Sequence, residues 1–571
     1  MKLFERMGKK LDKWRLAPSR RALVLLIYLL VALMIPNAAL AITESYTGWS
    51  VIAGIFIPLG AYLVANVITR RVGITVMCMV PIIILCTFQL VLLYLYGNSI
   101  IAADMFINLL TTNPDEASEL LNNLYPAVFV VCIIYAPILV EAFLQIRRKM
   151  RLTIKMQERI KWAGAVCLGI GLAALIPAYK KGSGNIVGNE IFPINVICNF
   201  NVALAANNDA MHYASTSKLF RYNVSRGGKS DEREIYVYII GEASRAANWN
   251  LYGYERETNQ YLKRRDDIYL FKNVITQSNT THKSVPLFLS SVATDQHRDL
   301  FYRKGLAALF NEAGFRTYFL SNQSPQGAMV DHLAKEANEV VYIGAPRHDM
   351  QLLRMMRRII ETDDNNDLLF ILHCYGSHFS YHQRYPREFA VYQPDNDVAI
   401  QPQNADMIRN AYDNSISYTD YFLNSTIDYL DALGVCSTLI YCSDHGEDIF
   451  DDERGRFLHA SPTVTYYQLH VPCLAWFSDK YAQLYPEKTA AAKKHRWSAA
   501  TTHSMFHTMA DMASLESAFI DRSVSFVSDD FVENAPRYYL NDHNEAVPFD
   551  KKIGITKQDR RLFAIHGIRL E

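Results

Sequence analysis

Acidic and imidazole side chains follow apolar, strand-like runs at three places in the second half of the chain. These are Glu242 after residues 236–241, His378 after residues 368–373, and Asp444-His445 after residues 438–442. Open α/β sheets place their sites at the edge where their parallel strands end. Carboxylate oxygen and imidazole nitrogen together suit a borderline metal such as zinc. A single Glu or His after a strand is more often structural, but the repeated pattern predicts a metal site at this edge.

A polar stretch after Glu242 supplies hydroxyl groups that such a metal could activate. A metal-bound hydroxyl loses its proton more easily and becomes an attacking group at neutral pH. The residue types leave four nucleophile candidates open, Ser278, Thr280, Thr281 and Ser284. The structural alternative is an ordinary Ser/Thr-rich helix cap. His459 and His470, which lie further along the chain, are additional imidazole candidates.

Strand and helix patterns alternate from residue 233 onward. The predicted strands are residues 235–240, 317–321, 368–373 and 438–442, and the predicted helices are residues 305–313, 350–360, 407–433 and 498–512. Such alternation indicates a largely parallel sheet with helices on both faces. We therefore expect one α/β/α sandwich.

Five apolar runs precede this part of the chain, at residues 22–42, 49–68, 74–96, 125–144 and 162–179. Each has about the 20 residues that a helix needs to cross a membrane. Basic residues cluster before the first run, after the second, and between the fourth and fifth. The positive-inside rule then predicts a cytoplasmic N-terminus and an outer C-terminal domain. The first run also resembles a secretory signal, but we favour an uncleaved helix because it is long and further spans follow.

These patterns predict three parts: a five-helix transmembrane domain (1–180), a membrane-proximal connector (181–232) and an α/β domain (233–571). A net charge of +1 argues against a nucleic-acid binder. The outer loop 98–123 carries a helix-start signal at Pro114. This loop is predicted to be either a capped surface helix or a membrane-proximal pocket that faces lipid headgroups.

Several short motifs follow one another along the chain in a characteristic order. They are Gly241-Glu242 with Ser244-Arg245-Ala246, residues 251–259, Thr281 with Ser284-Val285-Pro286, Gly376-Ser377-His378 with Arg384-Tyr385-Pro386, residues 443–447, and Leu458-His459 leading to His470-Val471-Pro472. Together they resemble the membrane-bound phosphoethanolamine transferases of Gram-negative envelopes, which include lipid A-modifying and mobile colistin-resistance enzymes. The resemblance covers nearly the whole chain. It implies a five-helix transmembrane domain followed by an alkaline phosphatase/sulfatase-like α/β/α sandwich.

The same resemblance implies roles for individual residues. It selects Thr281 as the nucleophile. The zinc ligands that it implies are Glu242, Thr281, Asp444 and His445. The positions that match contacts to the transferred phosphoryl group or to a second metal are His378 and His459, with His470 as a further substrate-binding candidate. Asn108 and Glu116, in the outer loop, match polar positions linked to substrate binding.

The sequence departs from the lipid A enzymes in three places. The nucleophile segment has no cysteine, and the cysteines beyond the membrane part sit mostly in or beside predicted strands, so we expect the family's disulfides to be absent. The loop 321–327 lacks a lysine found nearby in the lipid A enzymes, and Gln260 replaces a common proline. The first two differences leave the acceptor open between lipid A, a core sugar and a glucan.

The expected activity is therefore a zinc-dependent transfer of phosphoethanolamine from phosphatidylethanolamine to an envelope glycolipid, through a covalent intermediate on Thr281. We expect a multi-pass protein of the inner membrane, a monomer, with its catalytic domain in the periplasm. One alternative is transfer of glycerol phosphate, as by lipoteichoic acid synthases. Sulfatase activity is disfavoured because no Cys-x-Pro-x-Arg segment is present. The alternative from another class is a non-catalytic envelope binding or sensor protein.

Overall fold

The computed structural model forms two compact units. The first contains residues Met1–Ala102 and Leu121–Val202, and the second contains residues Ala103–Leu120 and Ala203–Glu571. The structure describes residues 17–44, 46–96, 100–111, 124–181, 185–227, 232–325, 329–344, 348–363, 367–461, 464–533, 535–549 and 555–568. We call the second the catalytic unit, because it holds the predicted catalytic residues.

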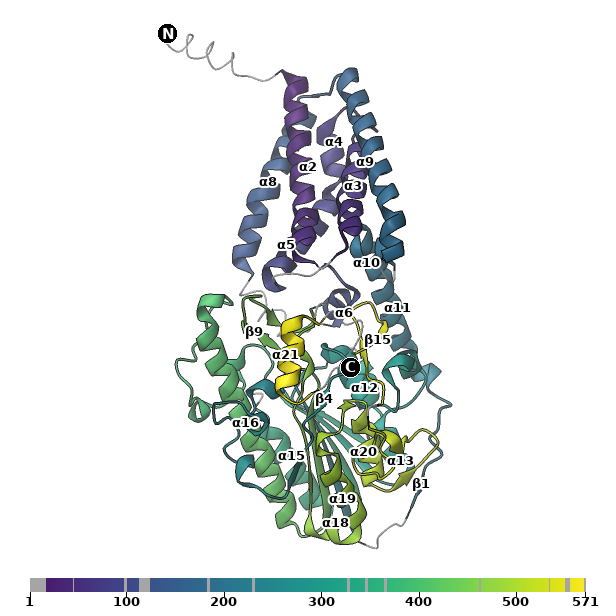
Figure 1. The fold of residues 1–571 in the computed structure, drawn as a ribbon, viewed down its shortest axis with the longest axis vertical. Helices are drawn as coiled ribbons and strands as arrows, with labels where there is room; N and C mark the ends of the chain where they lie inside the picture. The colour runs from purple at the N-terminus through teal and green to yellow at the C-terminus, as the bar shows by residue number, and fades with distance from the viewer. Residues whose placement is uncertain are drawn as a thin grey trace. The chain divides into compact units, whose positions relative to one another are not determined.

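Long apolar helices make up most of the first unit (Figure 1). Four of those described are long and apolar enough to cross a membrane: α2 (Pro18–Thr43), α3 (Gly48–Ala65), α8 (Tyr125–Arg147) and α9 (Ile154–Lys181). Pro18 opens α2, where a missing N–H costs nothing. Thr47 caps α3 by accepting a hydrogen bond from the Ser50 amide.

The third predicted span is not a single helix. It is divided into α4 (Val72–Cys78) and α5 (Val80–Tyr96), which are bent by 59° at the break. Pro81 stands at the start of α5, so the amide that would continue the helix is missing and its ring crowds the preceding turn. The described residues thus contain four candidate spans, or five if the bent pair is one span, and the prediction of five is not confirmed.

The catalytic unit is built on a seven-stranded sheet with the order β3-β11-β8-β2-β7-β5-β6. Its strands are β3 (Ile268–Leu270), β11 (Cys473–Phe477), β8 (Cys436–Ser443), β2 (Glu234–Gly241), β7 (Leu368–His373), β5 (Arg316–Ser321) and β6 (Glu339–Tyr342). The run from β8 to β6 is parallel, while β11 pairs antiparallel with β8 and with β3. All four predicted strands are present. The predicted α/β sandwich is confirmed, and β2 lies at the middle of the sheet.

Helices cover both faces of this sheet. Tyr236, Tyr238 and Ile240 alternate along β2 and belong to one buried cluster with residues of α13 (Leu306–Glu312) and α20 (Ser504–Met512). Every second residue of a strand faces the same side, so these two helices cover that face. Figure 1 shows α15 (Met350–Thr362) and α16 (Ala405–Ala432) on the opposite side of the strands.

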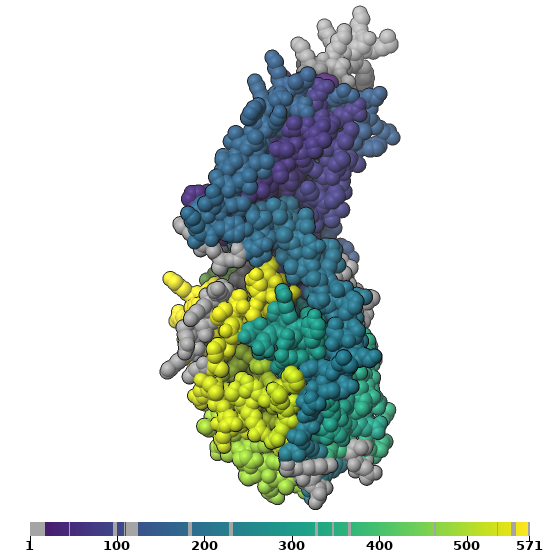
Figure 2. Space-filling model, turned by 90° about the vertical axis from the view of Figure 1, so that its right-hand side faces the viewer, coloured from purple at the N-terminus to yellow at the C-terminus, as the bar shows by residue number. Residues whose placement is uncertain are grey.

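One prediction about local structure needs correction. The helix predicted from residue 498 begins at Ser504, because Ala500–Thr501 form β12, which pairs with β4 (Val274–Ile275). The predicted connector contains a long helix, α11 (Ile194–Thr216). Beyond it, β1 (Ser225–Arg226) pairs with β13 (Leu515–Glu516), and Figure 2 shows the stretch after residue 203 lying along one face beside C-terminal segments.

Candidate active site

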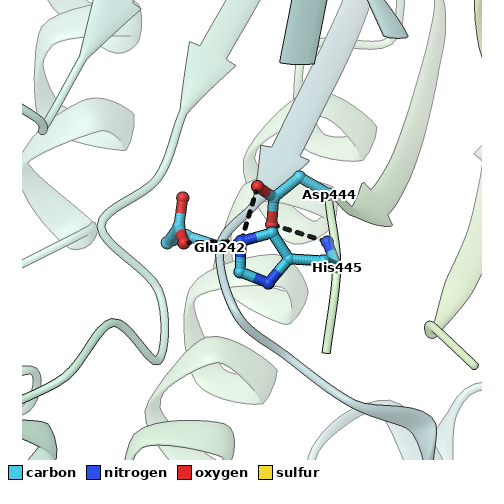
Figure 3. Close-up of side chains that lie close together, drawn as sticks. All are labelled: Glu242, Asp444 and His445. Atoms are coloured by element: carbon cyan, nitrogen blue, oxygen red, sulfur yellow. Dashed lines mark hydrogen bonds and ion pairs between the residues drawn. The ribbon is translucent and has the colours of Figure 1, made fainter. Parts of the chain in front are cut away.

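Two neighbouring strands deliver the three groups of a possible metal site. Glu242 follows β2, and Asp444 and His445 follow β8, whose last residue Ser443 pairs with Gly241. One ligand atom from each of the three side chains lies within 4.8 Å of the others, and all three residues are fully buried. Figure 3 shows the side chains facing one another. The parallel register therefore brings residues that are far apart in sequence to one point of the sheet edge.

Hydrogen bonds fix the orientation of Asp444 and His445. Oδ1 of Asp444 accepts from the amides of Ala243 at 3.2 Å and His445 at 2.7 Å, and Oδ2 accepts from the Ser284 hydroxyl at 3.2 Å. Nδ1 of His445 lies 2.9 Å from the Gly446 carbonyl, to which it can only donate. The unprotonated Nε2 then faces the cluster, 3.3 Å from Asp444 and 3.5 Å from Glu242. Burial lowers the pKa of His445 to about 4, which keeps the imidazole in the neutral form that binds metals.

Thr281 brings a hydroxyl group to the same point. It is the first residue of α12 (Thr281–Phe288), which follows Thr280 in extended conformation. Its Oγ1 lies 3.3 Å from each carboxylate oxygen of Glu242 and 3.1 Å from Nε2 of His445. The start of a helix favours negative charge, which helps the hydroxyl to lose its proton. In the described contacts, Thr281 is the nucleophile candidate whose hydroxyl touches both Glu242 and His445.

The donor set fits zinc. Two carboxylates, one neutral imidazole and one hydroxyl provide O and N ligands of the kind that zinc binds in fours. Burial raises the pKa of Asp444, because ionising a carboxyl without solvent is unfavourable. A bound cation would offset that cost at both acidic groups. The buried acids are therefore better suited to holding a cation than to standing alone.

Gln323, which sequence reasoning passed over, orients one of the proposed ligands. Its Nε2 donates to Oε2 of Glu242 and to the carbonyl of Cys374, at 2.9 Å in both cases. Gln323 lies in the loop after β5, and it is only 2% exposed. In the sequence, this loop differs from the lipid A enzymes only by its missing lysine. A glutamine in a polar loop gives no local signal that it supports a carboxylate from another strand.

His459 stands beside the cluster and is oriented by Glu447. The ring centroids of His459 and His445 are 4.1 Å apart. Nδ1 of His459 lies 3.2 Å from Oε1 of Glu447, whose Oε2 accepts a hydrogen bond from the Tyr381 hydroxyl at 2.7 Å. Burial lowers the pKa of His459 to about 4. Because Glu447 engages Nδ1, Nε2 is the ring nitrogen that could meet a ligand.

His378 belongs to the same group of imidazoles. Burial, followed by the charges of Arg384 and His459, holds its pKa well below the ordinary value. The ring stacks on Tyr375 with centroids 5.3 Å apart. Its Nδ1 is buried and has no hydrogen-bond partner among the described residues. This nitrogen is therefore free to meet a ligand.

The other predicted site residues are placed differently. Nδ1 of His470 lies 3.0 Å from the Tyr466 hydroxyl, and Nε2 lies 2.9 Å from the Lys272 carbonyl. Both ring nitrogens are therefore within hydrogen-bond distance of other residues of the chain. We leave His470 out of the proposed site for this reason. Asn108 belongs to α6 (Ala103–Thr111), but its side chain lies outside the described part. Glu116 lies outside the described residues altogether.

All nine cysteines are free, as the sequence predicted for those beyond the membrane part. Five of them, Cys198, Cys374, Cys436, Cys442 and Cys473, lie after the last apolar run. The four on the strands and in the loop after β7 are buried. The catalytic unit is therefore held together by its core rather than by disulfide bonds.

The sequence of the chain is similar to those of known proteins. Residues 234–515 match the sulfatase family. Kdo(2)-lipid A phosphoethanolamine 7''-transferase of Escherichia coli K12 is 30% identical over 324 residues, which are 54% of this chain and 55% of the relative. The match thus spans about half the length of that curated protein.

Two solved structures share the fold. The integral membrane protein lipooligosaccharide phosphoethanolamine transferase A (EptA) of Neisseria meningitidis has a TM-score of 0.69 at 20% identity, covering 88% of this chain and 98% of that one. The zinc complex of the C-terminal periplasmic domain of EptC from E. coli has a TM-score of 0.52 at 23% identity, covering 58% of this chain and 98% of that one. The resemblance predicted from the motifs is confirmed.

Proposed function

We propose that this chain, whose residues 234–515 form a sulfatase-family domain, transfers phosphoethanolamine from phosphatidylethanolamine to lipid A or a core sugar of lipopolysaccharide. The observation that carries the proposal is the position of the Thr281 hydroxyl, 3.1 Å from His445 and 3.3 Å from Glu242. Transfer through a covalent intermediate requires a nucleophile beside groups that activate it. Phosphoethanolamine is chosen as the transferred group because the similar E. coli protein is a lipid A phosphoethanolamine transferase.

Zinc is the cofactor that the donor set supports, and the zinc complex of the related E. coli domain agrees with this choice. Glu242, Asp444, His445 and Thr281 would hold the ion. When bound, it would lower the pKa of the Thr281 hydroxyl and stabilise negative charge on the phosphoryl oxygens.

Two displacements at phosphorus complete the proposed reaction. First, the Thr281 hydroxyl gives its proton to His459, Oγ1 of Thr281 bonds to the phosphorus of phosphatidylethanolamine while the bond to the diacylglycerol oxygen breaks, and His459 passes that proton to the diacylglycerol oxygen. Second, an oxygen of the acceptor bonds to phosphorus and the bond to Thr281 breaks, while His459 takes the proton of an acceptor hydroxyl and returns it to Oγ1 of Thr281. His378, with its unpartnered Nδ1, would hold a phosphoryl oxygen during both steps.

The same proposal includes a place in the cell. Counting the bent pair of α4 and α5 as one span gives five, which puts the two ends of the chain on opposite sides of the inner membrane. The basic clusters favour a cytoplasmic N-terminus and a catalytic unit in the periplasm. A lipid donor and a glycolipid acceptor would then share one membrane surface with the enzyme, which we propose to be a monomer.

Replacement of Thr281 tests the reaction directly. The purified protein is incubated with phosphatidylethanolamine, and the peptide that contains Thr281 is examined by mass spectrometry. We expect one phosphoethanolamine on the wild-type peptide and none on Thr281→Ala, since the attacking oxygen is gone. Thr280→Ala is the matched control, because Thr280 precedes the helix without capping it through its side chain. A phosphoethanolamine-modified peptide in Thr281→Ala at the wild-type level would refute the assignment.

Mass spectrometry of envelope glycolipids, from cells with and without the protein, separates the possible acceptors. An added phosphoethanolamine on lipid A or on a core sugar supports the proposal and names the acceptor. The same addition on a periplasmic glucan would change the acceptor, and an added glycerol phosphate would change the donor. No addition on any of them, together with no zinc in the purified protein, would favour a non-catalytic binding protein.

A further inference from the structure

An acidic residue from the segment between two apolar helices is buried in the catalytic unit. Helix α6 follows α5 in the chain, yet residues Ala103–Leu120 belong to the same compact unit as Ala203–Glu571. Asp104, near the start of α6, is only 2% exposed. Because burying an unpaired carboxylate is very unfavourable, this side chain needs partners of opposite charge.

The two residues that directly follow Thr281 lie beside this carboxylate, and Lys283 carries the opposite charge. Oδ1 of Asp104 lies 2.5 Å from Nζ of Lys283 and 3.5 Å from Nε2 of His282. Nζ of Lys283 donates a hydrogen bond to the main-chain oxygen of Asn541 at 2.7 Å. The side chains of His282 and Lys283 are 6% and 5% exposed. Burial raises the pKa of Asp104, but its two basic neighbours outweigh burial and keep the carboxylate charged.

The first turn of α12 needs such a support. Helix ends leave backbone amides without partners inside the helix, and a capping side chain usually satisfies one of them. Thr280 stands at the capping position but makes no such hydrogen bond through its side chain. His282 and Lys283 are the second and third residues of the helix, so holding their side chains also holds the turn that carries Thr281.

We infer that Asp104 is a positioning residue for the nucleophile, acting through Lys283 and His282 on the first turn of α12. The inference rests on the proposed role of Thr281. It gives the segment after α5 a part in the reaction that is separate from substrate contact. A buried charge contact at 2.5 Å limits movement of the turn far more than a contact at the surface would. Since a misplacement of about 1 Å can cost about a hundredfold in rate, loss of this support is expected to slow attack by Thr281.

The test compares Asp104→Asn with Asp299→Asn in the full-length protein. Asp299 forms a partly exposed ion pair with Arg303, in the same unit, and serves as the matched control. Formation of the phosphoethanolamine intermediate on the peptide that contains Thr281 is followed by mass spectrometry in single-turnover experiments at several concentrations of phosphatidylethanolamine. For Asp104→Asn we expect a rate at saturating donor about 10- to 100-fold lower, with little change in the half-saturating concentration. Asp104→Glu, which keeps the charge, is expected to recover part of the rate.

Removing Asp104 also leaves Lys283 without its acidic partner, so the variant could fail through instability alone. The double variant Asp104→Asn/Lys283→Met removes both charges and is expected to recover the melting temperature but not the rate. Recovery of both would show that Asp104 serves stability only and would overturn the inference. A wild-type rate in folded Asp104→Asn would overturn it as well.

Hydrogen exchange of the peptide from residue 276 to 288 gives a readout that does not depend on activity. We expect its amides to exchange at least several-fold faster in Asp104→Asn than in Asp299→Asn. If the wild-type protein forms no intermediate but the exchange differs in this way, the proposed function fails while support of the turn by Asp104 stands. If the intermediate forms and neither the rate nor the exchange changes, the function stands and this inference fails.

Discussion

Replacing Gln323 by methionine should weaken metal binding without removing any ligand. Methionine is similar in length and fills the same buried space, but it cannot donate to Oε2 of Glu242, which Gln323 does at 2.9 Å. A hydrogen bond to a charged group contributes about 1.5–3 kcal/mol, and the donor is only 2% exposed, so water cannot easily replace it. Because about 1.4 kcal/mol corresponds to a tenfold change, we expect zinc affinity to fall by about 10- to 150-fold.

Competition with a chelating dye measures this affinity on the metal-depleted, full-length protein. The matched control is Gln468→Met. Gln468 is also a buried amide that donates to a carboxylate, Oδ2 of Asp448, which is outside the proposed ligand set. Loss of Gln468 should lower the melting temperature but leave zinc affinity within about threefold of wild type, since no ligand loses a partner. Equal zinc affinities in Gln323→Met and wild type would refute the reasoning that Gln323 orients Glu242.

Two further predictions concern carboxyl groups whose pKa is raised by burial. Burial raises the pKa of Glu447 to about 8, and protonation of the neighbouring His459 would favour its carboxylate form. Glu447→Gln cannot ionise in this way, so it should lower kcat by about tenfold with little change in KM. It should add no further loss in a His459→Gln background, and steady-state kinetics of the single and double variants check this. Burial raises the pKa of Glu336 to about 7, so the folded state loses stability as pH rises from the ordinary value of 4.5 through 7. Glu336→Gln should therefore gain stability relative to wild type between pH 5 and pH 8 in urea unfolding, and a difference that does not depend on pH would contradict this.

The sequence predicted the sheet well because its strands carry strong local signals. The run from Glu234 to Gly241 is buried along its whole length, and such runs of Tyr and β-branched residues read as central strands. Because β2 and β8 are neighbouring parallel strands, the residues that follow them lie at the same edge of the sheet. The convergence of Glu242 with Asp444 and His445 therefore follows from strand ends that were visible in the sequence.

The sequence patterns did not predict the helices correctly where a tertiary contact or a single backbone group determines whether a helix forms or breaks. Hydropathy counts Pro81 as one apolar residue among many, although its missing N–H breaks the third apolar run into two helices. The mixed composition of residues 194–216 gave no clear helical period, yet this segment forms α11. Its last turns are held by contacts with distant residues, such as the bond from the Tyr213 hydroxyl to the Arg303 carbonyl at 3.1 Å. Tertiary packing, rather than propensity, stabilises such a helix.

The nucleophile was likewise predicted from a local motif, whereas its surroundings depend on residues that are far apart in the sequence. Residue types left four hydroxyls open, and the resemblance selected Thr281, which stands before the Ser-Val-Pro motif at the family's spacing from Glu242. The structure adds a physical reason, because Thr281 opens a helix whose first turn points its hydroxyl at Glu242 and His445. That turn is held by Asp104, which lies far away in sequence and between two apolar helices. A motif can therefore predict the attacking group, whereas the residues proposed to hold it in place are found only when the folded chain brings them together.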